Sequence, residues 1–219
     1  IAVSELTRQK VIQEYAIPKE KVQVVHNAVE ISADSVYNKV GCSDDKLILF
    51  LGRITIQKGP EHFVWAAKKV TTVEKNVKFV VAGSGDMEAR MVDVATDLGI
   101  ADKFIFTGFL RGPDVDRAFR MADLYVMPSI SEPFGITPLE AMRNGTPTLI
   151  SKQSGVSEVL KHCLKVDFWD IDQMANQMVS VLRYNDLYST LSEEGTKEVQ
   201  RFNWTIPAAQ CVKIYSSYL

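Results

Sequence analysis

The feature that most constrains this fold is a repeated alternation of short apolar runs with helical segments. Four apolar runs, at residues 47–51, 77–82, 104–107 and 124–127, each lead into a turn that contains glycine. Solid apolar strands separated by helices are typical of a parallel sheet that is covered on both faces. The sequence therefore predicts an α/β fold with a doubly wound, Rossmann-like parallel sheet of about six strands and helices on both faces.

The other elements follow from hydrophobic periodicity and from breaks at proline and glycine. Two more strands of the sheet are expected at 147–150 and 164–166, and two short strands before it at 1–4 and 21–26. Residues 27–45 are polar and are interpreted as a linker. Helices are expected at 5–15, 60–73, 87–98, 114–121, 137–143, 170–183, 185–199 and 205–219.

Composition limits the possible partners. The chain of 219 residues has a formal charge of −2, which gives no support to a general role in binding nucleic acid or membrane surfaces. Cysteines and histidines are scattered, so we expect reduced packing thiols of a cytosolic protein and no metal site. They are Cys42, Cys163 and Cys211, and His26, His62 and His162.

The stretch from residue 131 to residue 142 predicts an anion site. It leaves a buried strand, turns at Pro133 and Gly135, and enters a helix at Thr137. The free N–H groups of a first helical turn, and the positive end of the helix dipole, attract anions. Two acids, Glu132 and Glu140, flank this turn. An anion site between two carboxylates suits a ligand that carries both phosphates and hydroxyls.

For each of these two acids, ligand binding has to be weighed against a role that needs no ligand. Thr137, with Pro138 after it and Glu140 three residues on, has the pattern of a capping box, in which Glu140 bonds back to the Thr137 N–H. One carboxylate cannot fully serve both the cap and a ligand. Glu132 has no capping role, so it is either a solvated loop acid or an acceptor for ligand hydroxyls.

Two cations are expected on the same rim of the sheet. Arg53 follows Gly52 at the end of the first sheet strand, and Lys58 precedes the next helix. They are either ordinary surface cations or ligands of a diphosphate, and their position at the carboxyl ends of the strands favours the second role. The residues from 52 to 59 match neither G-x-G-x-x-G nor a P-loop, which disfavours dinucleotide and P-loop chemistry. Asp114 and Asp116 have the spacing of a metal-binding pair, but Asp114 is better explained as a helix cap.

With these residues established, the chain resembles the C-terminal half of a retaining glycosyltransferase of the GT-B fold, family four. The strongest likeness is the E-x7-E spacing of Glu132 and Glu140, with Phe134-Gly135 inside it. The other matching motifs are Gly52-Arg53, Lys58-Gly59, Ala82-Gly83-Ser84-Gly85, Phe106-Thr107-Gly108, Ala122-Asp123 and Pro128-Ser129. Where this family usually has Asn-Gly-Val at the crossing between domains, the chain has Asn27-Ala28-Val29.

The resemblance implies a role for each matched residue. Arg53 and Lys58 would bind the diphosphate of a nucleotide-sugar donor, and Glu132 would bind the sugar. These three residues would be the catalytic residues. Glu140 would bind the ribose. The remaining donor contacts would come from Gly52, Gly83, Phe109, Leu110, Phe134, Gly135, Ile136 and Thr137.

The resemblance also implies an organisation and an activity. Residues 1–30 would be a remnant of an N-terminal acceptor domain and the crossing from it, 31–202 the donor domain, and 203–219 a crossing helix. The implied reaction transfers a hexose from a UDP-, GDP- or ADP-sugar to a glycan or lipid-linked acceptor, with no metal or other cofactor. The expected location is cytoplasmic or peripheral at the membrane, and this half alone would be inactive. A nucleotide-sugar-binding module without turnover, or an epimerase or phosphorylase of similar fold, remains the alternative.

Overall fold

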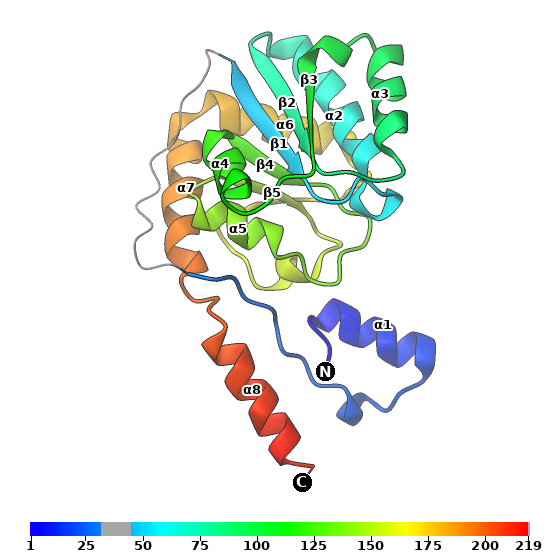
Figure 1. Ribbon diagram of the computed structural model, residues 1–219, viewed down its shortest axis with the longest axis vertical. Coiled ribbons are helices and arrows are strands. Elements are labelled where there is room, and N and C mark those ends of the chain that lie inside the picture. The colour runs from blue at the N-terminus through cyan, green and yellow to red at the C-terminus, as the bar shows by residue number, and fades with distance from the viewer. Residues whose placement is uncertain (32–44, 219) are drawn as a thin grey trace.

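The computed structural model describes residues 1–31 and 45–218, and its centre is a six-stranded parallel sheet (Figure 1). The strands lie in the order β3-β2-β1-β4-β5-β6. Because β1 pairs with both β2 and β4, the direction of winding reverses between β1 and β4, which confirms the doubly wound fold. The strands are β1 (Lys46–Leu51), β2 (Val77–Ala82), β3 (Phe104–Gly108), β4 (Leu124–Met127), β5 (Thr148–Ser151) and β6 (Leu164–Val166).

Helices cover both faces of the sheet (Figure 1). One face is covered by α2, α3 and α6 and the other by α4 and α5, while α7 packs against α5 and α6. The helices are α1 (Glu5–Tyr15), α2 (Pro60–Val73), α3 (Glu88–Asp97), α4 (Pro113–Met121), α5 (Thr137–Arg143), α6 (Ile171–Arg183), α7 (Asn185–Val199) and α8 (Thr205–Ser216). No helix in these described ranges is both long and apolar enough to cross a bilayer.

Alternate residues of the central strands enter two separate cores. In β1, Ile48 and Phe50 pack with the helices of one face, and Leu49 packs with those of the other. Leu124 and Tyr125 of β4 divide in the same way. Because both faces of the central strands are buried, residues 47–51 of β1 and the whole of β4 are continuous apolar runs in the sequence, and this is why these strands could be located from it.

The segment before the sheet differs from its prediction. The strands expected at 1–4 and 21–26 are wrong, since the two backbones meet only at the bridge between Ala2 and Val24. Ser4 already caps α1, its side chain accepting a hydrogen bond from Thr7 N. A 3-10 turn at Lys19–Lys21 overlaps the start of the second segment, which is otherwise irregular apart from Val24. Residues 32–44 of the expected linker, and Cys42 with them, lie outside the described residues.

Two helices lie at the periphery of the sheet domain. α1 and α8 both lie below it in Figure 1, and no residue of α8 is buried. The division of the chain at residues 30 and 202 stays a prediction. Cys163 and Cys211 are free thiols, and burial raises the pKa of Cys163 to about 12. Cys163 is therefore an unreactive packing residue.

Candidate functional site

The backbone at the carboxyl ends of β1, β2 and β3 is joined by hydrogen bonds from strand to strand. Gly52 N donates to Ala82 O at 2.9 Å, and Gly83 N donates to Gly108 O at 2.8 Å. A Cβ atom on Gly83 would lie 1.9 Å from the Gly52 carbonyl oxygen, so only glycine fits there. The glycines at the strand ends therefore build the shared rim that the sequence predicted.

A pocket of about 480 Å³ opens at this rim. It brings together five of the predicted site residues, which are Gly52, Arg53, Gly83, Phe109 and Leu110. The Phe109 side chain is exposed, and the Arg111 guanidinium lies over its ring at 5.3 Å from the centroid. The pocket thus combines a cation, a close backbone and an exposed aromatic ring, which together suit a nucleotide.

Glu140 lies in a second, adjoining cleft of about 470 Å³. Ile136 and Arg143 line this cleft as well, and Val115 lines both hollows. The structure therefore divides the predicted residues between two neighbouring spaces that meet at Val115. A ligand that contacts Arg53 and Glu140 together has to reach from the pocket into the adjoining cleft.

Lys58 and Glu132 form an ion pair at the corner where β4 leads into α5. Both side chains are largely buried, with 18% and 11% of their surface exposed. The turn that carries Lys58 is tied to the Glu132 loop, because Gln57 Nε2 donates to Ser131 O at 2.8 Å. The alternative of a solvated loop acid is therefore wrong for Glu132. The sequence did not show this, since the contact joins segments that are far apart in the chain.

The turn after Glu132 presents unused backbone donors. Among residues 1–31 and 45–218, no acceptor takes a hydrogen bond from the N–H groups of Phe134, Gly135 or Ile136. Gly135 has a φ of 98°, and a Cβ atom there would lie 3.2 Å from Glu132 Cγ. Glycine thus allows the turn to close over Glu132 while its N–H groups stay available to an anion.

The predicted capping box is absent. α5 begins at Thr137, the N-cap position is Ile136, and no side chain caps the helix. The Thr137 hydroxyl instead lies 2.8 Å from the Tyr125 hydroxyl on β4. Tyr125 is a residue that the sequence analysis missed, although a phenol in an otherwise apolar buried strand indicates that it needs a polar partner. The assignment of Asp114 as a cap is also wrong, because α4 already begins at Pro113.

Without the capping box, the Glu140 carboxylate is free for a ligand. No described residue hydrogen-bonds to it, and burial raises its pKa, an effect that the nearby Arg143 charge partly offsets. Arg143 itself is engaged by Asp116, which also accepts from Asn144 Nδ2 at 2.7 Å. A half-buried carboxylate that lacks hydrogen bonds is suited to accept ribose hydroxyls. Within the described ranges no three His, Cys, Asp or Glu side chains are grouped as metal ligands.

Comparisons with known sequences agree on one family. Residues 38–198 match the family model described as glycosyl transferases group 1. An uncharacterized glycosyltransferase of Methanocaldococcus jannaschii is 33% identical over 98% of this chain and 59% of its own length. A D-inositol 3-phosphate glycosyltransferase of Thermobispora bispora is 29% identical over 96% of the chain and 54% of its own length. The chain therefore spans little more than half the length of these relatives.

Solved structures agree on the fold. Anabaena HepE, solved in complex with UDP-glucose, matches 99% of this chain and 63% of its own, with a TM-score of 0.84 at 20% identity. TarM of S. aureus matches 98% of this chain and 42% of its own, also with a TM-score of 0.84, at 15% identity. Sheet order and these likenesses show that the fold is Rossmann-like, of the GT-B type. The family model covers most of the chain, and the chain belongs to the glycosyl transferases group 1 family.

Proposed function

We propose that this chain binds the nucleotide-diphosphate sugar donor of a hexosyltransferase that retains anomeric configuration. One observation carries the proposal. Arg53 and Lys58 lie in the segment after β1, and Glu132 and the unused N–H groups of residues 134–136 lie in the segment after β4, the two strands between which the winding reverses. Ligands of doubly wound folds bind at this point, and these groups are complementary to a diphosphate that carries a sugar.

Each part of the donor has a proposed partner. The base lies against Phe109 and Leu110, and the ribose hydroxyls donate to Glu140 across Val115. The diphosphate lies between Arg53, Lys58 and the N–H groups of the turn, close to the backbone at Gly52 and Gly83. Glu132 accepts hydroxyls of the sugar, and Thr137 places the start of α5. This arrangement is supported by the residues that line the two adjoining hollows.

The chemistry follows from the charges. Breaking the bond between the anomeric carbon and phosphate leaves a diphosphate anion and an oxocarbenium-like sugar. Arg53, Lys58 and the turn N–H groups stabilise the anion, and in such sites each donor contributes about 10²–10³ in rate. These cations take the place that a metal has elsewhere, so we propose that the reaction needs no metal or organic cofactor. The acceptor attacks from the face that the diphosphate leaves, and configuration is retained.

The rest of the enzyme is part of the same proposal. An N-terminal domain brings a glycan or lipid-linked acceptor, and the chain described here is inactive without it. We propose a cytoplasmic location, or a peripheral one at the membrane through that domain. Neither a binding module without turnover nor an epimerase or phosphorylase is favoured by any contact described above.

Calorimetric titration with UDP-, GDP- and ADP-glucose tests the proposal. We expect one of the three to bind, and intact-mass measurement afterwards to find no sugar attached to the protein, because the Glu132 carboxylate is held by Lys58 and does not act as a nucleophile. Glu132→Gln should lower affinity for the sugar nucleotide, again without an adduct. An adduct on Glu132 would contradict the retention mechanism, and failure of all three donors to bind would contradict the donor site.

The Glu140 carboxylate gives a second prediction, on stability as well as binding. Because burial raises its pKa in the folded chain, the protonated form is favoured by folding, and stability falls as pH rises from the unfolded pKa through the folded one. Glu140→Gln should therefore raise the melting temperature at pH 7, with a smaller gain at pH 4, and should weaken nucleotide binding. Melting curves and calorimetry at both pH values would reject the ribose role if nucleotide affinity were unchanged.

A further inference from the structure

The first turn of α1 lies against the loop that carries Glu132. Ser4 Oγ donates a hydrogen bond to Pro133 O at 2.6 Å, and Thr7 Oγ1 donates to the same oxygen at 3.1 Å. Lys10 Nζ lies 2.7 Å from the hydroxyl oxygen of Ser131. Three side chains from the N-terminal segment thus hold the two residues that flank Glu132 in the sequence.

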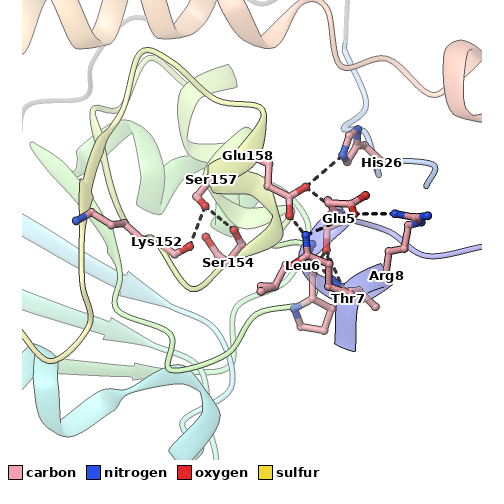
Figure 2. Close-up of polar contacts among 12 residues, drawn as sticks. Glu5, Leu6, Thr7, Arg8, His26, Lys152, Ser154, Ser157 and Glu158 are labelled. Carbon is pink, nitrogen blue, oxygen red and sulfur yellow. Dashed lines mark hydrogen bonds and ion pairs between the residues drawn. The ribbon is translucent and has the colours of Figure 1, made fainter. Parts of the chain in front are cut away.

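A second contact runs in the opposite direction (Figure 2). Glu158, at the end of the short 3-10 helix Gly155–Glu158, reaches from the sheet domain to the start of α1. Its two carboxylate oxygens accept hydrogen bonds from Glu5 N at 2.9 Å and Leu6 N at 2.6 Å, and His26 Nε2 lies 3.6 Å from Oε2. A carboxylate at a helix N-terminus satisfies free N–H groups and is favoured by the helix dipole. Glu158 therefore fixes α1 to the sheet domain.

Both contacts act on one short backbone ladder. Glu132 N donates to Gln153 O at 3.0 Å, and Gly155 N donates to Glu132 O at 3.0 Å. A Cβ atom on Gly155 would lie 2.2 Å from Pro133 O and 2.4 Å from Ser4 Cβ, so the three backbones meet without spare space. The Glu132 backbone is thus held between residues 153–155 and α1, while its side chain is held by Lys58.

We propose that Ser4, Thr7 and Glu158 are positioning residues that set Glu132 for the donor sugar. The inference rests on the proposed function, in which Glu132 contacts the sugar while Arg53 and Glu140 contact the nucleotide. Residues 1–31 lie outside the region that the family model matches, residues 38–198. A segment outside the matched region therefore controls the geometry of an acid inside it.

A contact that positions Glu132 and a contact that only stabilises the fold differ in their effect on binding. Loss of the α1 contacts should weaken binding of the sugar but not of the nucleotide. The measurable quantity is the ratio of the dissociation constant of the free nucleoside diphosphate to that of its glucose derivative. A contact that served stability alone would lower the melting temperature and leave this ratio unchanged.

The test is calorimetry on the whole chain with UDP-, GDP- and ADP-glucose and the three free diphosphates. Ser4→Ala/Thr7→Val removes both donors to Pro133 O, and Glu158→Gln leaves an acceptor for only one of the two α1 N–H groups. We expect the ratio to fall by about three- to tenfold in each variant, the usual range for a lost hydrogen bond, with diphosphate affinity unchanged.

Two matched variants serve as controls. Thr7→Ser keeps the hydroxyl and should keep the ratio of the unaltered chain. Arg8→Ala removes the hydrogen bonds from Arg8 to Val22 O and Lys19 O, which stabilise the same segment without touching the Glu132 loop. Its ratio should also stay unchanged. An unaltered ratio in Ser4→Ala/Thr7→Val and Glu158→Gln would overturn the positioning role while leaving the donor site intact. Absence of all binding by the unaltered chain would overturn the proposed function and this inference with it.

Discussion

Replacing Lys58 with alanine is expected to destabilise the chain strongly even without any ligand. The substitution leaves the Glu132 carboxylate, only 11% exposed, without its ammonium partner. Removing one member of a buried ion pair typically costs about 3–5 kcal/mol. For a domain of this size each kcal/mol lowers the melting temperature by roughly 2–4 °C. Urea unfolding and thermal melting would measure both quantities.

A double-mutant cycle separates the ion pair from the rest of the corner. Lys58→Met and Glu132→Leu each leave one charge unpaired, whereas the double variant leaves none. We expect the double variant to be more stable than either single one, since apolar replacements of buried pairs are often tolerated. The exposed pair of Glu194 and Lys197 provides the control, and Lys197→Ala should leave stability unchanged. A Lys58→Ala variant as stable as this control would show that Glu132 is not effectively buried.

The parts of the fold that local patterns determine were predictable from the sequence. Helix α2 and strand β2 have the predicted bounds, because the apolar residues of α2 face one core at helical spacing and those of β2 alternate between two cores. The short strands expected before the sheet were not correct. There, Ser4 and Pro18 lie close to the apolar residues, and capping and turn formation take precedence over pairing. Strand propensity in two separate segments does not determine how far they pair, and here they pair only at Ala2 and Val24.

The candidate site was predictable only in part. That Gly52, Gly83 and the turn at Gly135 share one rim follows from topology, since parallel strands end on the same edge. Three features depend on contacts between distant segments and could not be predicted. Lys58 forms an ion pair with Glu132, and the Thr137 hydroxyl is hydrogen-bonded to the Tyr125 hydroxyl. Val115 lines both the pocket of Arg53 and the cleft of Glu140.

Replacing Arg53 with alanine should have the opposite profile to Lys58→Ala, with a large effect on binding and little on stability. Arg53 is exposed at the mouth of the pocket, and no ion pair to it is found within the described ranges. Its guanidinium is therefore available to a diphosphate, and hydrogen bonds to charged groups contribute about 1.5–3 kcal/mol. We expect donor affinity to fall by roughly 10–150-fold, measured by calorimetry, while the melting temperature stays constant.

Two further variants test whether charge or shape is responsible for that loss. Arg53→Lys keeps the charge but lacks the planar fork of donors, so it should recover only part of the affinity. Lys103 directly precedes β3, at the amino ends of the strands, where its ammonium donates to Lys75 O; it is the control cation. If Lys103→Ala lowered donor affinity as much as Arg53→Ala, the effect would come from net charge. Arg53 would then have no specific role, because a directed contact depends on which cation is removed.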